Sequence, residues 1–264
     1  MRENSNICFK AMREVSLCII FVYLFCAYSF VCAAVELTGQ EIIKRSDDLM
    51  RGDTSHGRYK MTVITPDWQR TLELEAYSAG RDRTFIRVLS PVKEAGVTSL
   101  RVKTNMWNYL PKIERMIKIP PSMMLQPWMG SDYTNDDLVK ESSVVYDYTH
   151  VIADEENIGS DTAYKVELTP KPRAPVTWGK LIFWVRKKDF VPLREEFYSE
   201  HAKLIKVLEY SEVKQMSDRS IPTVWKMISS VKERHITIVE VQSVIYNQPL
   251  DENIFTMGNL KSVK

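Results

Sequence analysis

The stretch from Asn105 to Leu138 reads NMWNYLPKIERMIKIPPSMMLQPWMGSDYTNDDL. Two runs with alternating apolar residues, Met106–Leu110 and Ile113–Ile119, predict strands. Two prolines then lead into Ser122–Gly130, which is rich in Met and carries no charge. Because 27% of all residues are charged, an uncharged segment of this kind indicates either buried core or a surface that binds an apolar ligand.

Around this stretch the chain has the period of a sheet. Trp68–Ser78 alternates, with Leu72 and Leu74 on an apolar face, and Trp178–Lys187 is apolar on both faces, as in a central strand. Short turns separate the strands, which is typical of an antiparallel meander. We count about eleven strands in one mainly β domain, and a sheet of that size must curl or split.

Helices are few. Leu37–Arg51 has a helical apolar face, and Thr38 with Glu41 forms a capping-box pattern at its start. Thr134 with Asp137 predicts a second helix start after the Met-rich segment. The numerous turns, the first helix and the Met-rich segment predict a curled antiparallel sheet whose concave face is covered by helices.

The first 34 residues have the layout of a cleaved secretory signal peptide. A basic start precedes the apolar run Val15–Tyr28, and small residues at Val31–Ala34 suit signal peptidase. We expect a signal peptide over 1–34 and a single domain over 35–264. Two alternatives stay open: an uncleaved membrane anchor, since the apolar run to Ala34 has 20 residues, and a lipid anchor on Cys32.

All four cysteines, Cys8, Cys18, Cys26 and Cys32, lie in the predicted signal peptide. The remaining chain can form no disulfide, and an exported protein of this size without disulfides fits the periplasm of a Gram-negative bacterium. Without residues 1–34 the chain holds 33 basic and 32 acidic residues. This balance does not indicate a nucleic-acid partner, and no polybasic run for anionic membranes is present.

The sequence contains no pattern that predicts catalysis. It lacks nucleophile-elbow, Walker and dinucleotide-binding motifs, and its four histidines lack ligand spacing. Asp132, Asp136 and Asp137 resemble part of a calcium loop, but capping by Thr134 and Asp137 is the simpler explanation. Glu195 and Glu196 point to opposite faces of a strand and are expected to be solvated. We predict no catalytic site, no metal site and no cofactor; an uncharacterised hydrolase is the least favoured alternative.

A binding surface is the remaining candidate site. Met side chains adapt to varied apolar ligands, and Pro120, Pro121 and Pro127 favour a short, hinged lid over one long helix. On this interpretation Trp128→Asp weakens ligand uptake with little loss of stability; the alternative is that these residues are ordinary core. Arg115, on the same side as Ile113 and Ile117, would meet an anionic headgroup or pair with an acid across the sheet.

The central stretch resembles a known family. Trp107-Asn-Tyr109-Leu-Pro, then Arg115, then Met129-Gly-Ser-Asp-Tyr133 and Asp136-Asp-Leu138 are similar to the signature of the outer membrane lipoprotein-sorting proteins, the LolA-like group. Many relatives carry Phe where this chain has Tyr133. The resemblance extends over essentially the whole chain after the signal peptide.

The resemblance implies a LolA/LolB-like fold, which is an unclosed antiparallel β-barrel of about eleven strands. In this half-barrel, helices form a lid over an apolar cavity on the concave face. It implies a non-enzymatic, monomeric periplasmic carrier of lipid or lipoprotein acyl chains. It also implies an inner-membrane RND-type exporter and an outer-membrane acceptor as partners. A lipid-sensing or accessory protein without transport activity is the alternative. The lipid-binding residues that we predict are Leu72, Leu74, Trp107, Tyr109, Arg115, Met123, Met124, Leu125, Trp128 and Met129.

Overall fold

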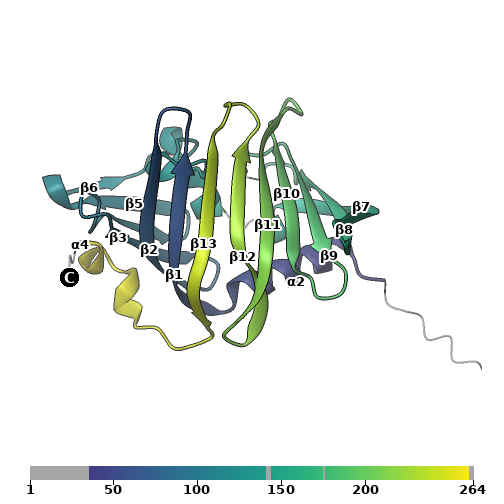
Figure 1. Ribbon diagram of the computed structural model, residues 1–264, viewed down its shortest axis with the longest axis horizontal. Helices are drawn as coiled ribbons and strands as arrows, with labels where there is room; N and C mark the ends of the chain where they lie inside the picture. Colours follow the sequence, from purple (N-terminus) through teal and green to yellow (C-terminus); the bar gives the residue numbers. More distant parts are fainter. Residues whose placement is uncertain (1–35, 141–143, 175, 262–264) are drawn as a thin grey trace, which may run out of the picture. The chain divides into compact units, whose positions relative to one another are not determined.

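One antiparallel sheet of 13 strands dominates the protein (Figure 1). The computed structural model describes residues 36–140, 144–174 and 176–261, so the predicted signal peptide and all cysteines lie outside the described residues. The strands are β1 (Thr54–Ile64), β2 (Gln69–Ala79), β3 (Arg83–Ser90), β4 (Thr98–Val102), β5 (Asn105–Leu110), β6 (Arg115–Lys118), β7 (Tyr148–Ile158), β8 (Asp161–Pro170), β9 (Lys180–Arg186), β10 (Pro192–Tyr198), β11 (Leu204–Met216), β12 (Arg219–Ser229) and β13 (Ile236–Tyr246).

The strand order is β6-β5-β4-β3-β2-β1-β13-β12-β11-β10-β9-β8-β7. Every pair of neighbouring strands is consecutive in the chain except one, in which the first strand, β1, pairs with the last, β13. The edge strands β6 and β7 therefore lie at opposite ends of the sheet, as Figure 1 shows. This arrangement confirms the predicted unclosed antiparallel barrel.

The sheet has 13 strands where we expected about eleven, and several of its strands are longer than the sequence predicted, because their ends are polar. The second half of β7 and the hairpin between β11 and β12 are exposed and rich in charged residues. Backbone pairing extends these strands to Ile158 and Met216. Apolar alternation marks only strands with one dry face, so these extensions left no such pattern.

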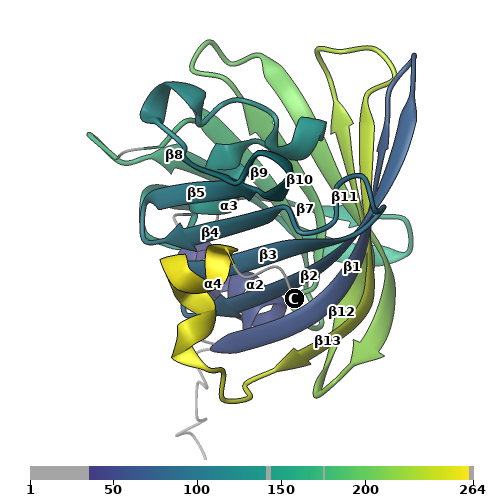
Figure 2. The ribbon, with the colours of Figure 1, turned by 90° about the vertical axis from the view of Figure 1, so that its left-hand side faces the viewer.

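The helices are α2 (Gly39–Arg51), α3 (Asn135–Lys140) and α4 (Met257–Lys261), with 3₁₀ turns η1 (Pro111–Ile113), η2 (Pro121–Met123), η3 (Trp128–Gly130) and η5 (Glu252–Phe255). Both predicted caps are present: Thr38 with Glu41 at α2, and Thr134 with Asp137 at α3. In Figure 2 the sheet curls around α2. The helix packs by Ile42 and Ile43 on the inner residues of β8 and β9.

The two faces of the sheet carry separate cores. On the concave face, α2 and the residues after β6 cover the sheet. On the convex face, η5 and α4 cover β3, β4 and β5 through Phe255 and Leu260. The central strand β9 is buried along both faces, as predicted, with Phe183 toward α2 and Trp184 on the opposite side.

Candidate functional site

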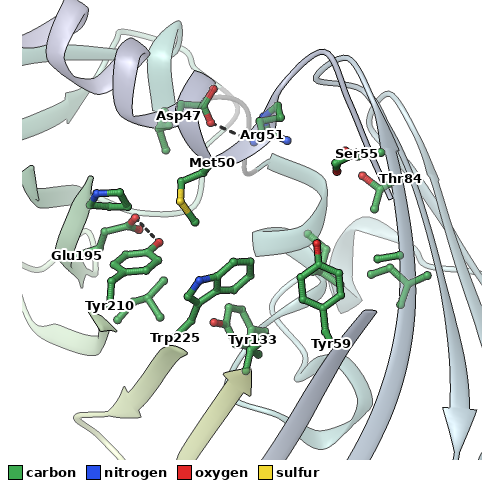
Figure 3. A pocket seen from close by; sticks show the side chains of 18 of the residues that line it. Asp47, Met50, Arg51, Ser55, Tyr59, Thr84, Tyr133, Glu195, Tyr210 and Trp225 are labelled. Carbon is green, nitrogen blue, oxygen red and sulfur yellow. Dashed lines mark hydrogen bonds and ion pairs between the residues drawn. The ribbon is translucent and has the colours of Figure 1, made fainter. Parts of the chain in front are cut away.

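A cavity of about 270 Å³ lies between α2 and the concave face of the sheet (Figure 3). Most of its lining is apolar, and both halves of the curled sheet contribute. The apolar lining comes from α2 (Ile43, Met50), β1 and β2 (Tyr59, Met61, Leu74, Ala76), β3 (Ile86), the segment after β6 (Trp128, Tyr133, Leu138) and the opposite wall (Phe183, Leu208, Trp225, Val239).

A second cavity of about 210 Å³ adjoins the first. Tyr133, Leu138, Phe183, Leu208 and Trp225 line both. The second cavity continues toward Tyr148, Trp178 and Met227 under α3. The concave face therefore offers two neighbouring apolar spaces that share walls, rather than one filled core.

Small residues in β1 and β2 create the space. Leu72 and Leu74 fill the inner face at one end of β2, while Ala76 and Ser78 follow at the next inward positions. Gly57 of β1 pairs with Ala76. A Cβ at Gly57 would lie 2.8 Å from Tyr59 Oη. The glycine thus admits the Tyr59 ring to the cavity wall, and the small pair leaves volume that larger side chains would fill.

Helix α2 is fixed over this space at both ends. A Cβ on Gly39 would lie only 3.1 Å from His150 Cβ, so the helix start packs closely on β7. Burial lowers the pKa of His150, and its Nε2–H donates to the Val144 carbonyl at 2.7 Å. At the C-terminus of α2, Arg219 donates to the Leu49 carbonyl, and also to the Asp48 carbonyl that accepts the Gly52 N–H, while Tyr246 donates to the Met50 carbonyl. At Leu49 and Met50 these donors satisfy groups that the helix cannot pair itself.

The cover opposite α2 is the segment from Pro127 to Leu138, which we call the strap. Trp128 is 4% exposed, and its Nε1 donates to Ser99 Oγ of β4 at 3.0 Å. Asp132 accepts from Thr237 Oγ1 of β13 at 2.8 Å, and its backbone N–H donates to the same hydroxyl. The strap thereby bridges strands from both halves of the curled sheet.

Lys206 attaches the other end of the strap. Its ammonium forms a buried ion pair with Asp137 and lies 4.9 Å from the ring centroids of Trp178 and Phe197. Asp137 also caps α3 with Thr134. Asp136 accepts from Thr177 at 2.5 Å. Asp132, Asp136 and Asp137 therefore each bond to another group of the protein. The capping explanation is supported over the calcium loop.

Two polar pairs interrupt the apolar lining. Tyr210 Oη donates to Glu195 at 2.7 Å, and Arg51 pairs with Asp47 at 3.1 Å (Figure 3). Sequence reasoning placed Glu195 in solvent. The structure places Glu195 on the cavity wall. Glu196 faces the other side of the sheet and accepts from Arg194 and Tyr198. The predicted alternation is therefore correct, but the helices cover the face on which Glu195 lies.

The predicted lipid-binding residues separate into three groups. Leu74 and Trp128 line the cavity, and Leu72, Met124 and Met129 belong to the core cluster beneath it. Trp107 and Tyr109 lie on the convex face against the C-terminal segment, because alternation in β5 sends Met106 inward instead. Arg115, Met123 and Leu125 are exposed and do not line the cavity.

Sequence reasoning missed most of the cavity wall. It assigned the apolar face of the first helix, which includes Ile43 and Met50, to a cover over the concave face, but it did not identify Tyr59, Glu195 or Trp225 as site residues. The inward period of β1 and β12 contained these aromatic residues, but nothing local distinguishes a residue facing a cavity from one facing filled core. The hinged-lid interpretation of Trp128 also needs correction, because its ring is buried and hydrogen-bonded.

Among the described residues there is no group of three His, Cys, Asp or Glu side chains placed to hold a metal ion. Within the same residues no helix is both long and apolar enough to cross a membrane.

A family model with the description "Uncharacterized protein" matches residues 80–262, well over half of the chain. No curated protein matches. Among solved structures, a DUF1329 family protein from Desulfovibrio piger has a TM-score of 0.78 at 23% identity, covering 84% of this chain and 97% of that one.

Two further structures carry a family name. A LolA superfamily protein from Nitrosomonas europaea has a TM-score of 0.72 at 22% identity, over 84% of this chain and 99% of that one. A protein described as an outer membrane lipoprotein-sorting domain, from Vibrio parahaemolyticus, has a TM-score of 0.73 at 22% identity, over 85% and 98%. The chain therefore belongs to the family of the matching model, and its fold is the LolA-like fold of outer membrane lipoprotein-sorting protein domains.

Proposed function

We propose that this protein is a periplasmic carrier that binds lipid or lipoprotein acyl chains non-covalently and moves them toward the outer membrane. The observation that carries the proposal is the apolar cavity of about 270 Å³ between α2, the strap and the curled sheet. The LolA-like fold supports it, since one similar structure is described as an outer membrane lipoprotein-sorting domain.

The cavity suits a chain that must be released again. Transfer of an acyl chain from water is favourable by about 0.8 kcal/mol per CH₂, so shape and apolar area suffice for binding. The second cavity shares walls with the first, which gives a chain room to extend past Trp225 and Tyr133. A carrier of this kind performs no chemistry on its cargo, and release depends on an acceptor with higher affinity.

The two polar pairs favour an amphiphile over a plain hydrocarbon. Glu195 with Tyr210, and Asp47 with Arg51, supply charged and hydrogen-bonding groups at the walls of an otherwise apolar space. A headgroup with hydroxyl, amine or phosphate groups would exchange hydrogen bonds with them while its chains fill the apolar part. As donor and acceptor we propose an inner-membrane RND-type exporter and an outer-membrane protein, with the carrier acting as a monomer.

The test compares two tryptophan substitutions on one strand. Ala76→Trp fills the cavity from β2, whereas Glu73→Trp places the same side chain on the exposed face of β2. After purification without detergent, mass spectrometry should find phospholipid or lipoprotein acyl chains bound to the unmodified protein and to Glu73→Trp. Ala76→Trp should carry several-fold less lipid at unchanged thermal stability.

A repeatedly empty cavity in the unmodified protein, or equal lipid on both variants, would count against the proposal. If lipid is bound, an assay of lipid movement from donor to acceptor vesicles separates carriage from sensing. A protein that binds lipid yet never accelerates its transfer would be a sensor or accessory protein of this fold.

A further inference from the structure

The edge of the sheet at β6 exposes a group of large apolar side chains. Ile113 is 58% exposed and Leu125 56%, with Ile117 and Met123 also exposed. All four lie between the last residue of η1 and the second residue after η2, in or beside the four-residue edge strand β6. We call these four residues with Lys112, Arg115 and Lys118 the β6 edge patch.

The charge around these side chains is positive. Lys112, Arg115 and Lys118 are exposed, and Glu114 is the acidic residue among them. Thr98 Oγ1 donates to the Leu260 carbonyl at 2.6 Å. This bond places exposed Lys261 at the end of β4 and β5 from which η1 continues. The sequence contains no polybasic run, but the edge and α4 gather basic residues that are separated in the chain.

The opposite edge of the sheet has the reverse charge. On β7, exposed Val151 and Ile152 are followed by a bulge and by Asp154, Glu155 and Glu156. Acidic residues and a bulge are common protection for an exposed edge strand. At β6 the apolar side chains instead stand among cations, which is the composition of a surface that enters the interface of an anionic membrane.

We propose that the β6 edge patch docks this protein on the surface of a bilayer that contains anionic lipid. Ile113, Ile117, Met123 and Leu125 would enter the headgroup region, and the three cations would lie at phosphate level with their stems against the apolar side chains. The inference concerns where the protein meets a membrane and does not depend on what the cavity holds.

The patch is connected directly to the cavity wall. The Met124 carbonyl accepts from the Asp136 N–H at 2.7 Å, and the Asn135 side chain donates to the Met123 carbonyl at 3.0 Å. Asp136 lines the second cavity and Trp128 the first. Docking through the patch would therefore bring the strap, and with it the cavity wall, next to the bilayer.

Vesicle sedimentation tests the proposal. The protein is mixed with vesicles of phosphatidylcholine alone, or of phosphatidylcholine with phosphatidylglycerol. Binding should favour the anionic vesicles and weaken with salt. Lys112→Glu with Arg115→Glu should weaken it at least roughly 30-fold, at about 1 kcal/mol for each lost cation. Ile113→Ser with Leu125→Ser should weaken it at every salt concentration.

The matched controls carry the same changes elsewhere. Lys214→Glu with Lys232→Glu changes the net charge equally, on the exposed β11–β12 and β12–β13 hairpins. Val151→Ser with Ile152→Ser removes two exposed apolar side chains from the β7 edge. All variants keep the same N-terminus, so any contribution of that segment to vesicle binding cancels. Equal binding by patch and control variants with unchanged melting temperatures would overturn the proposal, and so would equal binding to both vesicle types.

Discussion

The strap, Pro127–Leu138, and the segment before it, Pro111–Gln126, are adjacent in sequence but are held in very different ways. In the strap, Trp128 is buried and hydrogen-bonded to Ser99, and Asp132 is bonded to Thr237. In the preceding segment, Ile113, Met123 and Leu125 face solvent. Both parts are rich in apolar residues, yet one closes a cavity and the other projects from a sheet edge.

The comparison shows that side-chain hydrogen bonds and an ion pair to the sheet, rather than hydrophobicity, determine which apolar residues cover the cavity. The strap has polar side chains that bond to β4, β11 and β13, through Ser99, Lys206 and Thr237. The preceding segment is joined to the strap mainly through its own backbone carbonyls at Met123, Met124 and Gln126. Substitutions in the two parts should therefore have effects of very different size.

The largest difference is expected between Trp128→Ala and Leu125→Ala. Removing the buried Trp128 ring should lower the free energy of unfolding by ~3–5 kcal/mol, because a cavity replaces an indole and Ser99 loses its donor. Leu125→Ala removes an exposed side chain and should change stability by less than ~0.5 kcal/mol. Urea unfolding followed by circular dichroism measures both, and similar small losses would show that the strap is a loose lid after all.

Lys206→Met should produce the next largest effect. The substitution leaves the Asp137 carboxylate without its ammonium partner in a site where both side chains are nearly buried, at a cost of ~3 kcal/mol or more. Lys214→Met is the control, because the Lys214 pair with Glu212 is exposed and should contribute less than ~1 kcal/mol. If the two variants unfold at the same urea concentration, Lys206 does not hold the strap.

Much of this fold follows from local sequence pattern. Alternation in Trp68–Ser78 predicted β2 and its inward Leu72 and Leu74, and the spacing of Thr38 and Glu41 predicted the start of α2. The exposed ends of β7 and β11 were not predictable in this way, since backbone pairing with a neighbour holds them and their side chains carry no apolar period.

The site was less predictable than the fold. Alternation leaves the choice of inward face open, so Trp107 and Tyr109 were assigned to the cavity although they face the C-terminal segment on the convex side. The contacts that fix the strap join residues 29 to 105 positions apart, such as Trp128 with Ser99 and Thr237 with Asp132. No local pattern encodes such pairs, so burial of Trp128 could not be separated from exposure of Leu125.

The smallest effect that still separates the two segments concerns the helix cap of α3. Thr134 Oγ1 accepts from the Asp137 N–H at 3.1 Å, and the Thr134 N–H donates to the Asp137 carboxylate at 2.7 Å. Thr134→Ala removes one of these bonds and should lower the free energy of unfolding by ~1 kcal/mol. Ser122→Ala, in the exposed η2 turn, should change it by less than ~0.5 kcal/mol.

Because Asp137 also pairs with Lys206, the Thr134→Ala loss should shrink in a Lys206→Met background, where the cap is no longer held against β11. A double-mutant cycle by urea unfolding measures this coupling. Strictly additive losses would mean that the cap and the ion pair stabilise the strap independently.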